Sequence, residues 1–297
     1  MFGAQNFTPE QQAQSVGMKV FTWLVGVFEG YEEKGVLKRP QSGMTDAAGR
    51  IYVTDVGAHA VFVFDPNGKL TLWNSAAKGL RFVTPIGIAA GANGEVLVAD
   101  AELGRVFRLD ANGAPLGSFG QGMLSRPTGL ARDAKRGLVY VADTHGHDIK
   151  VFDDQGALVD TIAQRGEDEE GVNFPTHLAF ANDRLYVTDG MNARIQIFDA
   201  QGKPAGTLGK RGIMVGQLTR PKGVALDPAG NIYVVESYYD SLLVYNNAKR
   251  FLMAIGGTGK EVGQFYLPAG VWSDERGRIY VADMFNGRVV IFQFLGG

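Results

Sequence analysis

The amino-acid sequence predicts an all-β fold, namely a six-bladed β-propeller made of four-stranded antiparallel blades. The first observation is the phrase Ile279–Asp283, which reads Ile-Tyr-Val-Ala-Asp and has five earlier variants. The second is the spacing of the acidic residue that ends each copy, at positions 55, 100, 143, 189, 236 and 283. The steps of 43 to 47 residues, each filled with strand and turn signals, are typical of propeller blades.

Each repeat is expected to contain four strands. The first begins at a proline, as in Pro221–Leu226, because proline cannot donate to a strand ladder and suits a strand's first residue. A tight turn such as Asp227–Asn231 leads to the Tyr-Val-Ala-Asp strand, and a second turn such as Asp65–Gly68 joins the third and fourth strands. The loops that leave the second and fourth strands are long, so we expect them to share one face of the ring and to carry specificity.

The two ends of the chain predict how the ring closes. The last apolar run, 289–292, matches a third strand of a blade, while Val20–Phe28 is a spare apolar run before the first repeat. We therefore predict that Val20–Phe28 supplies the outer strand of the sixth blade, which removes an unpaired sheet edge. The domain prediction is an N-terminal extension over 1–17 and a propeller over 18–297.

Composition narrows the function classes. The 29 basic and 31 acidic side chains leave a net charge of −2, so a nucleic-acid partner is not expected. The absence of cysteine excludes disulfides and thiolate chemistry, and we expect no cofactor. The run 20–28 is too short to span a bilayer. The sequence carries no visible export signal; we favour an extracytoplasmic location with a signal already removed, while oligomeric state stays open.

The blades resemble those of the NHL-repeat family of six-bladed β-propellers. The residues that carry the resemblance are the proline-x-glycine strand starts, the Tyr-Val-Ala-Asp strands and the segments Asp143–Phe152 and Asp189–Phe198. The resemblance implies a scaffold role, because similar standalone propellers, exported bacterial ones in particular, act within larger assemblies. This chain departs from the pattern at Glu236, which replaces the aspartate, at Ser42-Gly43, which delays the first glycine, and at His177, which occupies a glycine position.

Metal chemistry is the first alternative to consider for the channel. Some similar propellers are zinc lyases that need three converging imidazoles, but of the four histidines only His177 is expected to approach the ring axis. His59 and His147 stand at the family's own histidine position and are interpreted as structural. We therefore predict no metal site, although a calcium site that uses Glu236 and Asn192 stays open. The recurring aspartates are interpreted as acceptors for N–H groups of their own loops.

Aromatic residues on the long loops of the last two blades are the candidate binding residues. Tyr238, Tyr239 and Asp240 form the strongest candidate, because adjacent loop side chains cannot all point inward and tyrosine is common at binding hot spots. Further candidates are Phe265, Tyr266 and Phe285, although packing between blades is an open alternative for the two phenylalanines.

Two candidates of other chemistry complete the predicted binding set. His177 is a candidate because of its place at the start of a strand, and Glu169 because it belongs to the acidic run 167–170.

The sequence leaves three functions open. The leading hypothesis is a non-enzymatic scaffold that binds a protein or peptide through the long-loop face. The second is a metal-dependent hydrolase or lyase with its site in the channel. The third is RNA binding, which would need a local basic patch on the ring. The residues that could form such a patch are Lys38, Arg39, Arg126, Lys210, Arg211 and Arg220.

Overall fold

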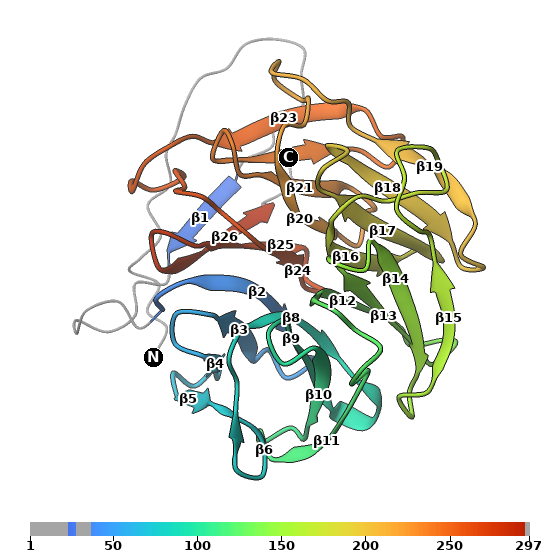
Figure 1. The fold of residues 1–297 in the computed structure, drawn as a ribbon. Helices are drawn as coiled ribbons and strands as arrows, with labels where there is room; N and C mark the ends of the chain where they lie inside the picture. The colour runs from blue at the N-terminus through green and yellow to red at the C-terminus, as the bar shows by residue number, and fades with distance from the viewer. Residues whose placement is uncertain (1–22, 28–36, 295–297) are drawn as a thin grey trace.

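A computed structural model describes residues 23–27 and 37–294, with the backbone alone for 23–27. Six four-stranded antiparallel sheets are arranged around a common axis (Figure 1), which confirms the six-bladed propeller. The innermost strand of each sheet contacts the innermost strands of its two neighbours, including β2 and β24, the first and last of the set. The expected extension, residues 1–17, lies outside the described residues.

The strands follow the repeat along the chain. The first blade contains β2 (Pro40–Thr45), β3 (Ile51–Asp55), β4 (Ala60–Phe64) and β5 (Leu70–Trp73). The second contains β8 (Pro85–Ala90), β9 (Val96–Asp100), β10 (Arg105–Leu109) and β11 (Pro115–Phe119), with a short 3-10 helix, η2 (Ala92–Gly94). The third contains β12 (Pro127–Asp133), β13 (Leu138–Asp143), β14 (Asp148–Asp153) and β15 (Leu158–Ile162).

The remaining blades repeat this order. The fourth contains β16 (Pro175–Ala181), β17 (Arg184–Asp189), β18 (Arg194–Asp199) and β19 (Pro204–Leu208). The fifth contains β20 (Pro221–Leu226), β21 (Ile232–Glu236), β22 (Ser241–Tyr245) and β23 (Phe251–Gly256). The sixth contains β24 (Val271–Ser273), β25 (Arg278–Asp283), β26 (Arg288–Phe294) and β1 (Trp23–Val27).

Five of the six innermost strands begin at the predicted proline, and the sixth differs. There Pro268 precedes the strand, and Ala269 and Gly270 make main-chain hydrogen bonds to Ala282 before β24 begins. The repeat did not predict a small hairpin between the first two blades, which consists of β6 (Ser75–Ala77) and β7 (Leu80–Arg81). Its Ala76 joins the core between these blades, so the hairpin fills space that the repeat does not cover.

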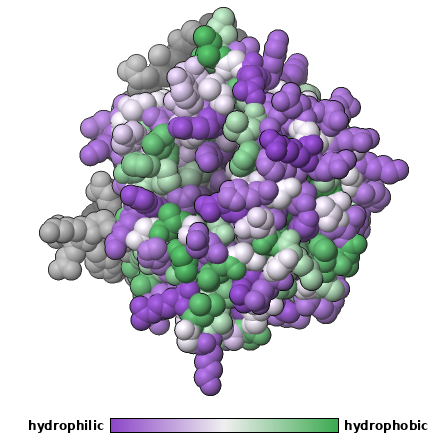
Figure 2. Space-filling model, in the orientation of Figure 1, coloured by the Kyte–Doolittle hydropathy of each residue, from purple (hydrophilic) through white to green (hydrophobic). Residues whose placement is uncertain are grey.

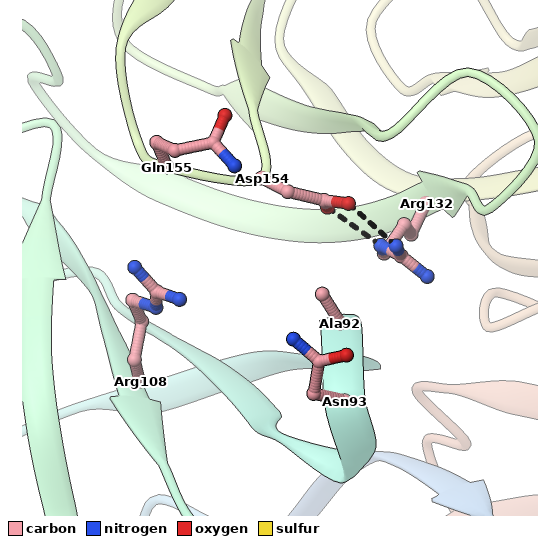
Figure 3. Close-up of a pocket in the computed structure, with 6 residues that line it drawn as sticks. All are labelled: Ala92, Asn93, Arg108, Arg132, Asp154 and Gln155. Atoms are coloured by element: carbon pink, nitrogen blue, oxygen red, sulfur yellow. Dashed lines mark hydrogen bonds and ion pairs between the residues drawn. The ribbon is translucent and has the colours of Figure 1, made fainter.

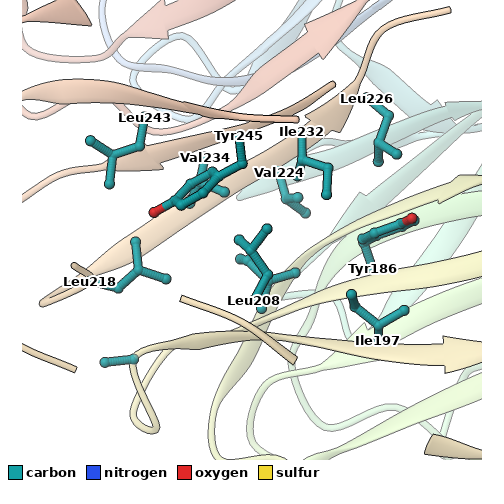
Figure 4. Close-up of a cluster of buried hydrophobic side chains, with 12 residues drawn as sticks. Tyr186, Ile197, Leu208, Leu218, Val224, Leu226, Ile232, Val234, Leu243 and Tyr245 are labelled. Carbon is teal, nitrogen blue, oxygen red and sulfur yellow. The ribbon is translucent and has the colours of Figure 1, made fainter. Parts of the chain in front are cut away.

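The hydrophobic core is divided into six clusters, and each lies between two neighbouring blades. One of them, between the fourth and fifth blades, contains Leu208, Val224 and Leu243 (Figure 4). Another joins the sixth blade to the first, with Trp272 and Ile291 in the same cluster as Val53. Because every blade is covered on both faces, the second strands are buried over at least their last five residues, as in β9 and β17. This explains why they read as apolar runs rather than as alternating patterns.

Five of the second strands carry a buried tyrosine, and in three of them the phenol hydroxyl has an aspartate partner. Tyr52, Tyr233 and Tyr280 each donate to an aspartate in the turn that precedes the strand, at 2.9–3.0 Å. Burial raises the pKa of all three phenols, so they remain donors throughout the physiological range. The turn and the strand that follows it are therefore tied by a buried hydrogen bond.

The predicted closing strand is described in part. β1 pairs antiparallel with β26, with Trp23 opposite Phe294 and Val27 opposite Val290. Val20–Thr22 and Phe28, which belong to the predicted run, lie outside the described residues. That this strand holds the ring closed stays a prediction.

Removal of residues 1–27 should test it. Loss of β1 leaves the edge of β26 unpaired, and an unpaired edge invites association between chains. We expect a lower thermal unfolding temperature, by about 2–4 °C for each kcal/mol lost, together with concentration-dependent light scattering. Removal of residues 1–17 alone is the control and should change neither measurement. Equal behaviour of the two truncations would contradict the closing role.

Candidate functional site

The two faces of the ring differ in how much apolar surface they expose. Among the described residues, eighteen large hydrophobic side chains are exposed, and twelve of them lie on the long loops. The other six lie on the fourth strands of their blades, and none lies on the short turns. Figure 2 shows one face of the ring, with hydrophilic side chains around a hollow near its centre. The long-loop face is therefore the candidate binding face.

Each blade places a buried carboxylate at the end of its second strand. In the first blade Asp55 accepts hydrogen bonds from the N–H groups of Lys38 and Arg39, which precede the innermost strand, and of Gly57 and Ala58 in its own loop. Glu236 of the fifth blade accepts from Thr219, Arg220 and Tyr238 in the same way. The prediction that these acids accept N–H groups of their own loops is confirmed in blades one, two, three and five. Asp189 and Asp283 instead accept main-chain N–H groups from the preceding loop, those of Asn173 and Tyr266. In all six blades the acid binds the loop that leads into the blade.

Blades four and six add a second set of contacts around this carboxylate. Asp283 accepts from Asn286 Nδ2 at 2.7 Å and from Arg288 Nε at 2.8 Å, and the Arg288 guanidinium also donates to carbonyls of Lys260, Glu261 and Gln264. Asp189, Asn192 and Arg194 repeat the arrangement in blade four. Burial raises the pKa of both aspartates, and the hydrogen bonds from asparagine and arginine oppose that shift. The side chains thus fix the preceding connecting loop.

Blade five lacks this arrangement. The positions of the asparagine and the arginine are taken by Tyr239 and Ser241. The connecting loop before this blade is held by other contacts: Thr219 Oγ1 donates to the carbonyl of Gly212, Met214 N–H donates to the side chain of Gln217, and the Tyr245 hydroxyl donates to the carbonyl of Gly216. The first three blades also lack the asparagine and arginine pair, so blade five differs in this respect from blades four and six alone.

The structure exposes four of the predicted aromatic residues. Tyr238 and Tyr239 are 59% and 40% exposed, and their rings meet edge to face at 4.9 Å. Tyr266 and Phe285 are also exposed and form a second pair at 5.5 Å. The N–H of Phe285 donates to the carbonyl of Tyr266, so this pair joins the sixth blade's own loop to the loop that leads into that blade.

Two predicted contacts have to be corrected. Phe265 is fully buried and packs against Phe292 at 5.9 Å, because its strand bridge with Thr258 turns it into the core between blades five and six. Asp240 is also buried: one carboxylate oxygen accepts from Thr258 Oγ1 and the other from the N–H of Leu267, at 2.7 Å each. These two residues hold loops in place and present no surface to a partner.

Glu169 lies where the acidic run was expected, on the connecting loop before the fourth blade. Its side chain is exposed, while its carbonyl accepts from Gln196 Nε2. Arg194 donates to the carbonyls of Glu167 and Gly171 in the same loop. The loop is therefore fixed through its main chain, and its carboxylates stay available on the surface.

The sequence reasoning missed the most exposed apolar residues of the described chain. Ile213, Met214 and Val215 are 78%, 69% and 77% exposed and form the tip of the connecting loop before blade five. Val262, at the tip of the next connecting loop, is 68% exposed. A signal was present, because these residues occupy the tip position that carries 167–170 one blade earlier, between Gly212 and Gly216. Alignment of the connecting loops would have revealed it.

His177 lies in the central channel, as predicted. It lines a cavity of about 220 Å³ together with residues such as Gly129, Val224 and Trp272 from other innermost strands. Its ring is buried, and neither ring nitrogen makes a hydrogen bond to a described protein group within normal geometry. Burial, and next the charge of Lys222, lower the pKa of His177 to about 3, while the main chain of Gln41 opposes the shift. The imidazole is therefore neutral at physiological pH.

The other histidines have local partners. His59 Nδ1 lies 2.5 Å from the carbonyl of Val83, and His147 Nδ1 accepts from the N–H of Phe174 at 3.3 Å. His145 and His147 both pack against the ring of Phe174.

Over residues 37–294, no three acidic or histidine side chains are grouped in a way that could hold a metal ion. In the same part of the chain, no helix is long and apolar enough to cross a membrane.

A pocket of about 420 Å³ lies on the opposite face beside the short turns (Figure 3). Its charges already have partners: Arg132 makes two hydrogen bonds to Asp154, at 2.7 and 2.8 Å, and Arg108 makes two to Glu95, at 2.8 Å each. The Arg132 guanidinium lowers the pKa of Asp154. The charged groups of this pocket are therefore already paired with one another.

The substitution Asp283→Asn should destabilise the fold. The amide cannot accept the three hydrogen bonds equally well, and Arg288 is left nearly buried without its counter-ion. We expect a loss of unfolding free energy on the order of 3 kcal/mol in urea denaturation. Asp160→Asn, at an exposed strand position, is the control and should be neutral. A neutral Asp283→Asn variant would refute the structural role of the carboxylate.

His177 should make the fold sensitive to acid. Its pKa is lower in the folded chain than in the unfolded chain, so between pH 6.5 and about 3 the unfolded state binds more protons. The free energy of unfolding should therefore decrease as the pH is lowered from 6.5 to about 3. This residue contributes at most about 1.4 kcal/mol per pH unit to the decrease. In His177→Gly, which restores the glycine found at Gly129 and Gly223, urea unfolding should show a shallower dependence on pH. An unchanged slope would contradict the assignment.

Comparisons with known proteins agree with this architecture. A sequence model of the NHL repeat matches residues 124–152. Protein SUPPRESSOR OF QUENCHING 1, chloroplastic, of Arabidopsis thaliana is 34% identical over 84 residues, which are 24% of this chain and 8% of that protein. The E3 ubiquitin-protein ligase NHLRC1 of Homo sapiens is 31% identical over 124 residues, 41% of this chain and 30% of that protein. The chain thus spans less than a third of the length of these relatives.

A solved structure extends the likeness to nearly the whole chain. Virginiamycin B lyase from Staphylococcus aureus, with quinupristin, superposes with a TM-score of 0.65 and covers 92% of this chain and 100% of that one. At 13% identity, the likeness concerns the fold alone. The matched repeat, its six regularly spaced copies and the six-bladed ring together support the predicted resemblance to the NHL-repeat family of β-propellers.

Proposed function

We propose that this protein is a non-enzymatic scaffold that binds a protein or peptide through the long-loop face of the propeller, as part of a larger assembly. The observation that carries the proposal is the distribution of exposed apolar side chains, which favours the long loops and spares the short turns. Concentrated apolar exposure on one face of a folded domain is typical of an interaction site.

The binding surface is proposed to be the apolar rim, which we define as Tyr238, Tyr239, Tyr266, Phe285 and the tip 213–215. These residues come from the loops of blades five and six, and all are exposed. Exposed apolar area costs roughly 25 cal/mol per Å² relative to burial, so a partner that covers the rim gains free energy. Tyrosine and phenylalanine supply this area with little loss of conformational entropy.

The tyrosine pair is the expected centre of the rim. Its two rings support each other at 4.9 Å, and the N–H of Tyr238 is held by Glu236. Aromatic side chains on a fixed backbone are typical binding hot spots. The exposed carboxylates of the acidic loop, with Glu169 among them, are proposed to add selectivity for a partner with basic groups.

The relatives give limited support. The name of NHLRC1 describes a ubiquitin-protein ligase, an activity directed at proteins, and 30% of that protein aligns with this chain. A protein partner for the propeller agrees with that name.

The test uses affinity capture from the native source with the full chain as bait. Tyr238→Ala combined with Tyr239→Ala should leave thermal unfolding unchanged, because both side chains are exposed, and should abolish capture of the partner. The matched control is Leu158→Ala combined with Val159→Ala, which removes two adjacent exposed apolar side chains from β15 instead. Capture that survives the tyrosine change, or that both double variants lose equally, would remove the proposed rim.

A further inference from the structure

We propose that the mouth of the central channel on the long-loop face is a binding site for a carboxylate group, which Lys222 and His177 hold. The carboxylate belongs either to a small organic acid or to an acidic peptide. This site is separate from the apolar rim, and the proposal does not depend on the scaffold function.

The two residues come from bulges in neighbouring innermost strands. The pairing of β20 with β21 runs from Pro221 to Val224 and skips Lys222, and the pairing of β16 with β17 runs from Pro175 to Leu178 and skips His177. A bulge takes a side chain out of the regular alternation of a strand and redirects it. His177 lines the channel cavity, and Lys222 lies on the neighbouring innermost strand, since β16 and β20 are in contact.

Lys222 is a partly buried ammonium group without a counter-ion in the described part of the chain. Burial lowers its pKa, and the charge of Arg220 lowers it further. The nearest blade carboxylate, Glu236, is committed to the N–H groups of Thr219, Arg220 and Tyr238. A buried cation is costly unless it is paired, so the channel favours an anion from outside.

The channel cavity itself contributes unpaired polar atoms. Both ring nitrogens of His177 are buried, and no described protein group within hydrogen-bonding geometry serves them. The neutral imidazole carries one N–H, which can donate to a carboxylate oxygen. Two neighbouring innermost strands thus offer an imidazole donor and an ammonium group.

Three arginines that precede innermost strands add positive charge near the channel mouth, and none of them is neutralised by a carboxylate of the described chain. Arg39, Arg126 and Arg220 each stand directly before the proline that opens an innermost strand, in blades one, three and five. None of the three guanidinium groups pairs with a carboxylate within residues 37–294. Three equivalent positions on alternate blades surround the axis, so they raise the local concentration of an approaching anion.

Carboxylate is favoured over phosphate and nucleic acid. One partly buried ammonium is balanced by one negative charge, whereas a phosphate near neutral pH brings more than one. A nucleic acid needs an extended basic surface, and this face also carries the exposed acids of 167–170. A compact monoanionic group fits both limits.

The experiment follows the four histidine side chains of the full protein by nuclear magnetic resonance after histidine labelling, with His177 assigned by comparison with His177→Gly. Sodium lactate and an end-capped peptide that contains a single glutamate are titrated separately. We expect a saturable shift of the His177 signal, and the probe that binds about tenfold more tightly identifies the source of the carboxylate. Lys222→Met should weaken binding by about tenfold or more, and Lys222→Arg should restore most of it.

Control variants and probes make the outcome decisive. Lys249→Met removes an exposed lysine from a short turn and should leave binding unchanged. Lys222→Met should unfold at the same or a higher temperature than the parent, because it removes an unpaired buried charge. The proposal is overturned if neither carboxylate shifts the His177 signal, if Lys222→Met binds like the parent, or if inorganic phosphate or an RNA oligonucleotide binds more tightly than both carboxylate probes.

Discussion

The buried carboxylate at the end of each second strand is the interaction on which the rest of the ring depends. In the first blade a single side chain, Asp55, receives four main-chain N–H groups from two different loops. One loop leads into the blade, and the other joins its second and third strands. A backbone N–H that is buried without a partner costs free energy comparable to a lost hydrogen bond. The carboxylate therefore sets where each innermost strand begins, and with it the spacing of the blades around the axis.

Variation around this carboxylate separates structural loops from candidate binding loops. In blades four and six an asparagine and an arginine fix the connecting loop through its carbonyls, as Asn286 and Arg288 do. In blade five the equivalent positions hold Tyr239 and Ser241, and the preceding loop exposes 213–215. Other contacts stabilise that loop, among them the hydrogen bond from the Tyr245 hydroxyl to the carbonyl of Gly216, so the two positions can hold other side chains. In blade five, unlike in blades four and six, one of these positions holds an exposed aromatic side chain, that of Tyr239.

The chemistry of the long-loop face is divided by distance from the axis. Apolar and acidic side chains lie on the loops, whereas His177 and Lys222 belong to the innermost strands near the channel. The charged groups of the short-turn pocket, by contrast, are already paired with one another. The unpaired channel groups and most of the exposed apolar side chains thus lie on the long-loop face, and this difference places the candidate functions.

The sequence by itself determined the ring, because a period of 43 to 47 residues with a fixed order of proline, strand, turn and acid leaves one architecture. It also placed His177 in the channel and predicted that the aspartates bind N–H groups. Only the tertiary structure decided which loop residues are exposed: Phe265 and Asp240 turned inward, whereas 213–215 remained on the surface. The reason is physical, since strand period and turn chemistry are local, while the burial of a loop side chain depends on blades that lie far apart in the chain.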